Sequence, residues 1–247
     1  MRRRHRIILT INGLRVQRSK SFCLSVPFLN FLPGTVTCIV GANGSGKTTL
    51  MESIVGLAPP SEGVVKVSGN DAHLEIAEVK RAIGFIPDDD TWIIPELTAT
   101  EFFELLASVH ASKDRLKRIV RSAQTLAKEL MFDSFNSQLG SLSHGNKKKV
   151  QIIAGLMHDP HFIVVDELRN GLDPIAILRA ERILRHKQMS GTAIIAATHD
   201  LWWAERFADE VVMIRRGHII LNDYTKTIVE KYGSVESRFM ELYSNAT

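Results

Sequence analysis

The sequence predicts an α/β fold whose sheet is largely parallel. Short apolar segments rich in β-branched residues alternate along the chain with segments of helical periodicity, which is the pattern of strands linked by covering helices. The chain has 247 residues, 45% hydrophobic and 23% charged, which suits one large domain with an inserted subdomain. The segments that we interpret as buried strands are Thr35–Val40, Ala82–Ile86, Phe162–Val165 and Thr192–Ala197.

A long helical stretch lies between the second and third of these strands. From Thr98 to about Met131 the apolar residues recur at helical spacing, and Thr98 and Glu101 have the spacing of a capping box at its start. We therefore expect an inserted helical subdomain over approximately residues 95–155. The residues predicted to form one buried stripe of this stretch are Leu116, Ile119, Val120, Ala123, Leu126, Ala127 and Leu130.

Three more elements are indicated toward the C-terminus. A helix is expected over Val150–Leu156, and the Asp-Pro pair that follows would end it. Asp173 precedes a proline, the arrangement of an N-cap followed by proline at the first helical position. The apolar segments Val211–Ile214 and His218–Leu221 flank Arg-Arg-Gly, which indicates a β-hairpin. Strands and helices thus alternate over most of the chain.

Composition and charge exclude several classes of function. The net charge is +4, and only Arg2–Arg6 and Lys147–Lys149 are densely basic, so no nucleic acid is expected as a partner. No apolar run approaches the roughly 18–20 residues of a membrane-spanning helix, and no secretory signal follows the N-terminal basic run. Cys23 and Cys38 do not make a disulfide framework and are expected to be reduced packing residues in a cytosolic protein.

The segment Gly41–Thr48 matches the phosphate-binding pattern G-x-x-x-x-G-K-[ST] without departure. A buried strand precedes it, and a helix is expected over Thr49–Gly56. Glycines let successive backbone N–H groups point into one concavity, and the helix N-terminus adds partial positive charge. Lys47 should reach the β- and γ-phosphates, and Thr48 should ligate Mg²⁺. The residues expected to bind the nucleotide phosphates are Asn43, Gly44, Ser45, Gly46, Lys47, Thr48 and Thr49.

Two carboxylates, Asp166 and Glu167, directly follow the apolar strand at 162–165. Ligands of parallel sheets bind at the carboxyl ends of the strands. Asp166 is suited to hold Mg²⁺ through a water, and Glu167 is suited to orient or deprotonate the attacking water. The next buried strand should deliver His199 to the γ-phosphate at the same edge. Lys47, Glu167 and His199 are therefore the predicted catalytic residues.

The segment Leu142–Asn146, Leu-Ser-His-Gly-Asn, lies before the acidic strand and at the start of a helix. It resembles the L-S-G-G-Q signature of the nucleotide-binding subunits of ATP-binding cassette (ABC) transporters. Together with the motifs above, the resemblance runs from about Ile7 to Asp223. It implies a phosphate-loop (RecA-like), mostly parallel core with an antiparallel β subdomain and the inserted helical subdomain, in a single nucleotide-binding domain over residues 1–247.

The resemblance also implies roles for further residues. In the family, the signature of one subunit closes over ATP held by a second, so Ser143 and Gly145 are expected to contact the nucleotide of a partner. The segment Asn170–Asp173 resembles the loop that couples the two sites. Asp88 stands where most members have a glutamine that contacts Mg²⁺, and an aspartate could still ligate the ion. The cofactors implied are ATP and Mg²⁺, and the implied metal ligands are Thr48, Asp166 and Asp88.

Several positions depart from the family pattern. His144 replaces a signature glycine, and Leu168 replaces the proline that usually follows the catalytic glutamate. The usual position of the aromatic residue that stacks on adenine falls near Arg18. The planar guanidinium of Arg18 could stack there, and Phe22 is the alternative.

The lysine run Lys147–Lys149 leaves two interpretations. Three lysines in the first turn of a helix oppose the helix dipole, and a phosphate brought by a partner would offset that cost. The alternative, which we favour for at least two of the three lysines, is a solvated basic face.

The sequence therefore predicts the ATP-binding and ATP-hydrolysing subunit of an ABC transporter, most similar to single-domain cassettes of drug and bacteriocin exporters. It would power export through a separate integral-membrane permease subunit, as a homodimer or with a related cassette, on the cytoplasmic face of the cell membrane. Two alternatives remain open. One is a non-transport ABC scaffold of the iron–sulfur assembly type. The other is a weakly hydrolysing regulatory module, which the departures at Asp88, His144 and Leu168 motivate.

Overall fold

The computed structural model describes residues 8–74, 76–110 and 113–244, and the basic run Arg2–Arg6 lies outside them. The strands are β1 (Leu9–Ser19), β2 (Phe22–Phe31), β3 (Val36–Val40), β4 (Glu62–Val67), β5 (Asn70–Asp71), β6 (Ile83–Ile86), β7 (Phe162–Asp166), β8 (Ala193–Thr198), β9 (Glu210–Arg215) and β10 (His218–Tyr224). The helices are α1 (Lys47–Ile54), α2 (Ala77–Ala82), α3 (Ala99–His110), α4 (Lys113–Glu129), α5 (His144–Leu156), α6 (Pro174–Met189), α7 (Leu201–Phe207), α8 (Thr225–Tyr232) and α9 (Val235–Ser244).

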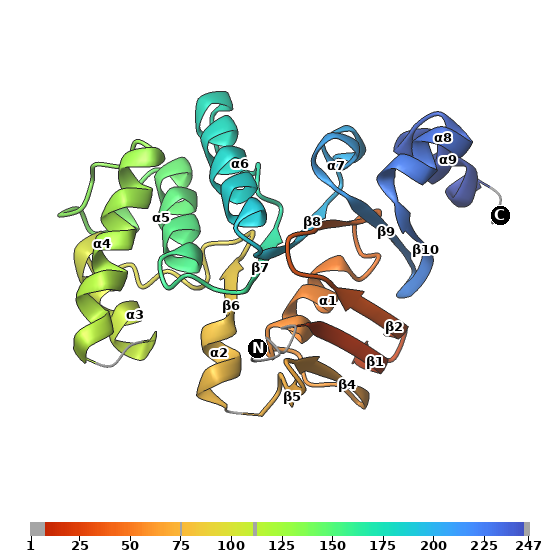
Figure 1. The fold of residues 1–247 in the computed structure, drawn as a ribbon, viewed down its shortest axis with the longest axis horizontal. Helices are drawn as coiled ribbons and strands as arrows, with labels where there is room; N and C mark the ends of the chain where they lie inside the picture. Colours follow the sequence, from red (N-terminus) through yellow and green to blue (C-terminus); the bar gives the residue numbers. More distant parts are fainter. Residues whose placement is uncertain (1–7, 75, 111–112, 245–247) are drawn as a thin grey trace, which may run out of the picture.

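Within the described residues, ten strands form one curled sheet in the order β5-β4-β1-β2-β10-β9-β3-β8-β7-β6 (Figure 1). The run β9-β3-β8-β7-β6 is parallel, whereas β1 pairs antiparallel with both β2 and β4. Strand β10 joins the two parts, because it pairs antiparallel with β9 and parallel with β2. The predicted α/β class with a mostly parallel core and an antiparallel part is therefore confirmed.

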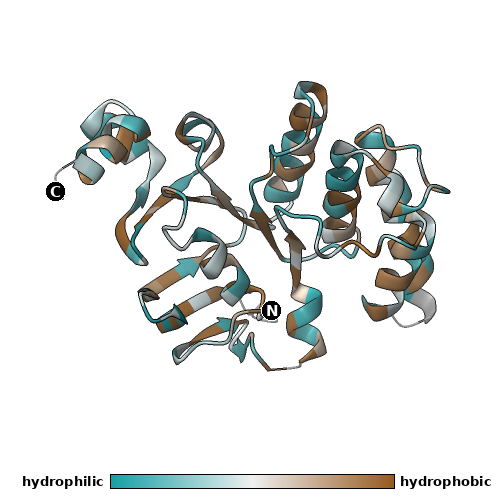
Figure 2. Cartoon of the chain, turned by 180° about the vertical axis from the view of Figure 1, so that it is seen from behind, coloured by the Kyte–Doolittle hydropathy of each residue, from teal (hydrophilic) through white to brown (hydrophobic). Residues whose placement is uncertain are grey.

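The predicted buried strands agree with β3, β6, β7 and β8 to within one residue at each end. Their residues are almost entirely apolar because helices cover both faces of a parallel sheet. Figure 2 shows these central strands in brown, between helices of mixed hydropathy. The predicted hairpin is also present, with Arg215 paired to His218 across the turn.

Two helices begin earlier than their apolar periodicity indicated. Helix α1 starts at Lys47, inside the phosphate-binding pattern. Helix α5 starts at His144, before the apolar residues from Val150 on, and in the signature segment that was expected at the start of a helix. Ser143 explains the second case, because its hydroxyl oxygen accepts a hydrogen bond from the backbone N–H of Asn146 and caps the helix. The first turn of α5 is polar, so its helical period was not visible among the apolar residues.

Helices α3, α4 and α5 pack against one another beyond the β6 edge of the sheet (Figure 1). The capping box before α3 is present: the backbone N–H of Thr98 donates to Glu101 Oε2 at 2.8 Å, and the N–H of Glu101 donates to Thr98 Oγ1 at 3.3 Å. Most of the predicted stripe of α4 is buried, and Leu116 and Val120 are partly buried at its edge. Asp173 caps α6 by accepting from the N–H groups of Ile175 and Ala176.

Both cysteines are free thiols. Burial raises the pKa of the Cys38 thiol in β3, which makes it an unreactive packing residue. None of the described helices is long and apolar enough to cross a membrane.

Candidate nucleotide site

The phosphate-binding loop joins the carboxyl end of β3 to the N-terminus of α1. Gly44 and Gly46 have φ angles of 75° and 113°, which a residue with a side chain rarely adopts. A Cβ at Gly46 would also approach the ring of Phe22 to 3.0 Å. The Nζ of Lys47 donates to the carbonyl oxygens of Gly41, at 2.9 Å, and Ala42. Lys47 therefore lies inside the concavity of the loop, where it can exchange these carbonyls for phosphate oxygens.

The floor of this site is acidic. Asp166 ends β7 and is 3% exposed, and the side chain of Thr48 donates a hydrogen bond to it. Burial raises the pKa of Asp166, and the Thr48 hydrogen bond opposes that rise. Burial lowers the pKa of Lys47, whereas the charges of Glu167 and Asp166 raise it. The two carboxylates thus favour the charged form of the buried lysine.

Glu167 is held in a strained and well-defined position. Its φ of 46° lies in the left-handed region, and its N–H donates to the carbonyl of Ala197 on β8 at 3.0 Å. The carboxylate accepts from Thr198 Oγ1 at 3.2 Å and lies 2.9 Å from His199 Nδ1. Thr198, at the end of β8, and His199, which follows it, therefore orient this carboxylate, as a general base requires.

Most of the residues that the sequence predicts for the nucleotide site line one pocket of about 470 Å³. Ser45, within the loop, is buried, and its hydroxyl has no hydrogen-bond partner among the described residues. His199 reaches the site through Glu167. Ser143 and Gly145 do not line this pocket. The residues that line it are Arg18, Phe22, Asn43, Gly44, Gly46, Lys47, Thr48, Thr49, Asp88, Asp166 and Glu167.

Both adenine candidates lie at this pocket. Arg18, near the end of β1, forms an ion pair with Glu52 of α1. Phe22, at the start of β2, packs its ring against Gly46 and is partly buried. The guanidinium of Arg18 is therefore already engaged, whereas the ring of Phe22 borders the phosphate loop directly.

The Asp88 loop is joined to the segment that follows Glu167. Asp88 Oδ1 accepts from Asn170 Nδ2 at 2.8 Å, and Arg169 forms an ion pair with Asp200. Sequence reasoning did not find these contacts, because they join residues far apart in the chain.

The signature segment packs against the same loops from the other side. The ring of His144 lies against Gly171, and a Cβ at Gly145 would approach the Gly171 carbonyl oxygen to 2.8 Å. The Nζ of Lys147 lies 3.3 Å from Asp90 Oδ2. Gly145 is thus required by close backbone approach, and His144 is accommodated in place of a glycine because Gly171 has no side chain.

The solvated-face interpretation fails for Lys148, whereas Lys147 and Lys149 are partly exposed. Lys148 is 1% exposed, and its Nζ donates to the carbonyl oxygens of Pro87 and Asp166. Lys147 is paired with Asp90, and Lys149 Nζ donates to a carbonyl of the helical layer. Position 148 lies four residues before Ile152 and seven before Gly155, so helical spacing from the buried residues of α5 could have revealed it.

The oxygen donors of Thr48 and Asp166 fit a Mg²⁺ ion. They are hard ligands in hydrogen-bonding contact at the floor of the pocket, and Asp88 lines the same pocket. Among the described residues, no three His, Cys, Asp or Glu side chains gather into a metal site. Mg²⁺ could be held here by one or two protein oxygens, with phosphate and water oxygens completing its shell.

Comparison with known proteins identifies the family. A family model described as ABC transporter matches residues 27–170, which include the phosphate loop, the signature segment and the acidic strand. The chain belongs to the ABC transporter family. It is an ATP-binding cassette, and this family hydrolyses ATP.

Relatives and solved structures agree with this assignment. The chain is 29% identical to the ABC transporter ATP-binding protein NatA of Bacillus subtilis, over 95% of this chain and 96% of that protein. It is 30% identical to the uncharacterized ABC transporter ATP-binding protein YdbJ of the same organism, over 86% of this chain and 68% of that protein. A solved ATP-binding subunit of an ABC transporter superimposes with a TM-score of 0.85 at 25% identity, covering 96% of this chain and 99% of that chain.

Proposed function

We propose that this cassette hydrolyses ATP in a dimer and thereby drives transport through a separate membrane subunit. The observation that carries the proposal is the pocket in which the phosphate loop meets the carboxylates of Asp166 and Glu167. Steady-state release of phosphate from ATP by the purified chain, with and without Mg²⁺, is the primary test. No release above that of a Lys47→Ala variant would contradict the proposal.

Each side chain of the pocket has a distinct proposed role. Lys47 and the loop N–H groups bind the β- and γ-phosphates, and Thr48, Asp166 and Asp88 provide the oxygens for Mg²⁺. When bound, Mg²⁺ neutralises charge on the phosphates. Glu167 accepts a proton from, or orients, the attacking water. His199 lies 2.9 Å from Glu167 and could contact the γ-phosphate from the same edge.

We propose that the adenine stacks on Phe22, with Arg18 at the rim of the same pocket. The ion pair of Arg18 with Glu52 favours this choice, because the guanidinium is already engaged. Replacing an aromatic residue that stacks on a base with alanine weakens binding by about 1–3 kcal/mol. ATP affinity should therefore fall more in Phe22→Ala than in Arg18→Ala.

Dimerisation would complete the site. Ser143 and Gly145 are at the N-terminus of α5, outside the pocket of their own chain. A helix N-terminus with free N–H groups suits the γ-phosphate of ATP held by a second copy. The test is light scattering in the presence of ATP. The Glu167→Gln variant should form a dimer. The double variant Glu167→Gln, Ser143→Arg should bind ATP and stay monomeric. An ATP-bound dimer of the double variant would contradict the composite site.

We propose that the membrane subunit docks on the Asp88 loop and on the helical subdomain at about 95–155. Large apolar side chains are exposed here on the loop, at Trp92 and Ile94, and on α3, at Val109. Such exposed side chains suit a protein interface. Trp92→Glu should weaken co-purification with the membrane subunit while leaving phosphate release by the isolated cassette unchanged.

Export is the proposed direction, and the cytoplasmic face of the membrane is the proposed location. The similarity of residues 142–149 and of Ile86-Pro87-Asp88 to exporter cassettes supports this proposal. ATP-dependent accumulation of cargo in inside-out vesicles would support export. ATP-dependent uptake by right-side-out vesicles would contradict it.

A second candidate function is a cassette with slow turnover. Asp88 adds a negative charge beside Asp166 and is one of the causes that raise its pKa. If Asp88 slows hydrolysis, then Asp88→Gln should increase phosphate release. An unchanged or lower rate in that variant would contradict the cassette with slow turnover.

A further inference from the structure

A buried cation lies behind the acidic floor of the nucleotide pocket. Lys148 is 1% exposed, and it belongs to α5, the helix that begins at the signature segment. Its Nζ donates to the carbonyl oxygen of Pro87 at 2.7 Å and to that of Asp166 at 3.2 Å. A buried ammonium is costly unless it is hydrogen-bonded and close to opposite charges. Both requirements are met at this position.

The opposite charges are those of the pocket itself. Burial lowers the pKa of Lys148, and the charges of Asp88, Asp166 and Glu167 oppose that effect. Reciprocally, Lys148 is one of the groups that oppose the raised pKa of Asp166. Lys148 is therefore in the electrostatic field of the carboxylates that surround the phosphate loop. Lys148 does not line the nucleotide pocket.

The contacts of Lys148 join three segments of the chain through one atom. Pro87 precedes Asp88, Asp166 precedes Glu167, and the helix that carries Lys148 begins beside Ser143. Neighbouring side chains of α5 strengthen the attachment to the loop at 87–90. Lys147 is paired with Asp90, and Gln151 donates to the carbonyl oxygen of Asp89.

We propose that Lys148 is a positioning residue for ATP hydrolysis. Its ammonium holds the backbone on which Asp88 and Glu167 are carried, and its charge compensates the aspartate at position 88. This proposal rests on the roles proposed above for Asp166 and Glu167. The compensation follows from charge: without Lys148, three carboxylates would share one partly buried site with Lys47 as their remaining buried cation among the described residues.

The test is a double-mutant cycle on the full chain. Lys148→Met, Asp88→Asn and the double variant are compared for kcat and KM of ATP hydrolysis, with rates expressed per nucleotide-binding site titrated with a fluorescent ATP analogue. We expect Lys148→Met to lower kcat about tenfold with a smaller change in KM, since residues in contact couple by about this factor. In the Asp88→Asn background, Lys148→Met should lower kcat by less than about threefold.

Two further variants separate positioning from general stability. Lys149→Met removes a neighbouring lysine whose Nζ donates to the carbonyl of Met131, and it should leave kcat unchanged. Lys148→Arg keeps the charge and should retain more activity than Lys148→Met. Equal losses of kcat with and without the Asp88→Asn substitution would overturn the charge compensation. An unchanged kcat per binding site in Lys148→Met would overturn the positioning role.

A folding failure remains informative. If Lys148→Met does not fold, recovery of a folded chain in the double variant with Asp88→Asn supports compensation, and failure of the double variant to fold overturns it. The proposed function is tested separately. If Glu167→Gln hydrolyses ATP at the normal rate, the role of Glu167 fails, and this result is distinguishable from any outcome at position 148.

Discussion

Buried ionisable groups are stabilised in different ways at the two ends of the parallel strands. At the carboxyl ends, Asp166 is buried beside Thr48, Lys47 and Lys148, and opposite charges stabilise one another. At the amino ends, a cleft of about 780 Å³ between α2, α4 and the end of α5 has a mixed lining of apolar residues, the carboxylates Glu78 and Asp159, and six basic residues. These basic residues are Arg81, His110, Arg115, Arg118, His158 and His161.

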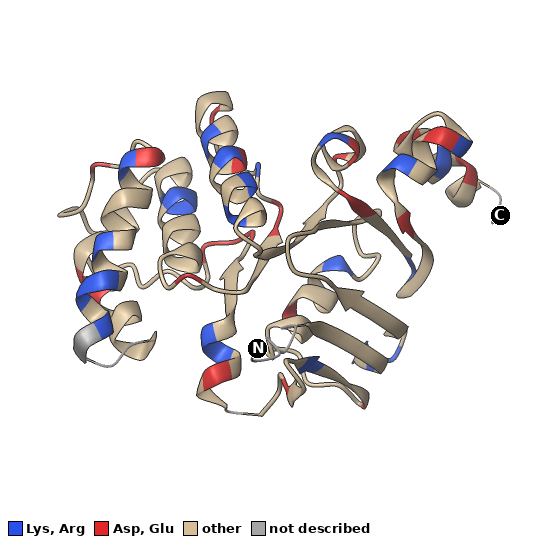
Figure 3. Ribbon diagram, in the orientation of Figure 1, with Lys and Arg blue, Asp and Glu red and all other residues tan. Residues whose placement is uncertain are grey.

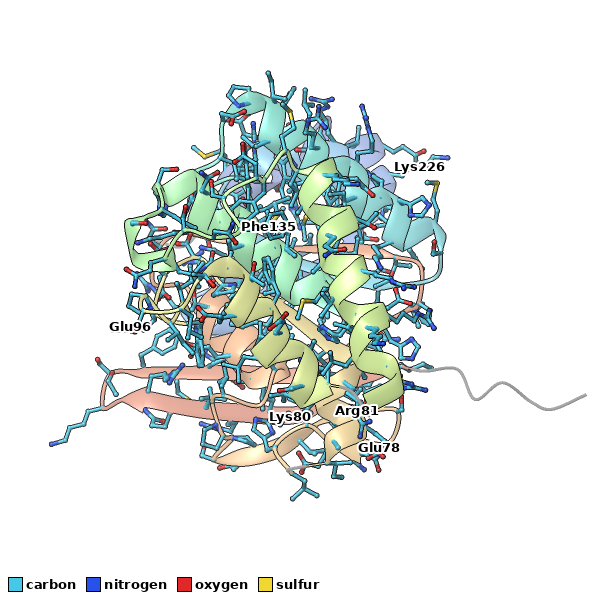
Figure 4. All side chains as sticks on the ribbon, turned by 90° about the vertical axis from the view of Figure 1, so that its left-hand side faces the viewer. Glu78, Lys80, Arg81, Glu96, Phe135 and Lys226 are labelled. Carbon is cyan, nitrogen blue, oxygen red and sulfur yellow. The ribbon has the colours of Figure 1, made fainter. Side chains whose placement is uncertain are left out.

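At the amino ends, burial lowers the pKa of His110 and of His158 and so favours their neutral forms. The rings of His110 and His158 stack with centroids 4.1 Å apart. Burial, with a smaller contribution from His110, lowers the pKa of His158 to about 4. Figure 3 shows Lys and Arg on α2 and α4, and Figure 4 shows Lys80 and Arg81 of α2 at the ends of α3 and α4. The comparison teaches that the buried ammonium groups at the carboxyl ends lie beside carboxylates, whereas burial favours the neutral ring of His158 at the amino ends.

The largest effect is expected at the carboxyl ends. Glu167→Gln removes the base while keeping the shape of the side chain, so kcat should fall about 10²–10⁴-fold. ATP affinity should change by less than about threefold, because Lys47 and the loop N–H groups remain. Phosphate release and nucleotide titration measure the two quantities. The control is Glu62→Gln, an exposed residue of β4, and a normal rate in Glu167→Gln would contradict the assigned role.

The neutral histidine predicts an acid-sensitive stability. The pKa of His158 is about 4 in the folded chain and about 6.5 when unfolded, so between these values the unfolded state binds more protons. The free energy of unfolding should therefore fall as pH decreases from about 6.5 to about 4, by an amount on the order of 3 kcal/mol. Urea titrations of His158→Gln should show a flatter dependence on pH in this window. His161→Gln, at the exposed side of the cleft, is the control, and a wild-type slope in His158→Gln would contradict the neutral state.

At the rim of the nucleotide pocket, Phe22→Ala should weaken ATP binding by about 1–3 kcal/mol through loss of stacking. Arg18→Ala should weaken it by less, because its guanidinium is paired with Glu52. Isothermal titration of both variants with ATP gives the comparison directly. A larger loss in Arg18→Ala would move the adenine contact to the guanidinium.

The smallest effect is expected at an exposed ion pair near the amino ends. Lys187 Nζ lies 2.7 Å from Asp159 Oδ1, and the Asp159 side chain is 66% exposed. The hydrogen bond from Lys187 lowers the pKa of Asp159, but solvent screens the interaction. Lys187→Ala should therefore lower the free energy of unfolding by less than about 1 kcal/mol. A loss above about 2 kcal/mol in a urea titration would show that this end also depends on paired charge.

Much of the nucleotide site was predictable because its signals are short in sequence. The phosphate loop, the pair Asp166 and Glu167, and the strand that ends before His199 each combine a buried strand with polar residues at its carboxyl end. Parallel strands bring such ends to one edge whatever the loops between them do. The resemblance to the cassette family added Arg18, Phe22 and Asp88, and the structure places all three at the same pocket.

Contacts between distant segments were not predictable in the same way. A solvated face is the interpretation favoured for at least two lysines of the run at 147–149, yet the ammonium of Lys148 donates to the carbonyl oxygen of Pro87, 61 residues earlier in the chain. The bond between Asn170 and Asp88 spans 82 residues. No periodicity or spacing within one segment records such a partner.

The sequence by itself determined the phosphate loop and the alternation of strands and helices, because these depend on local backbone geometry and on hydrophobic period. The family and its ATP hydrolysis were indicated by the resemblance of the signature segment and the motifs around it. Only the tertiary structure decided which ionisable groups are buried and which neighbours they meet. Lys148 and His158 illustrate the reason. Both are polar side chains of the same segment of chain. Packing against distant elements places Lys148 beside carboxylates, and it lowers the pKa of His158 to about 4.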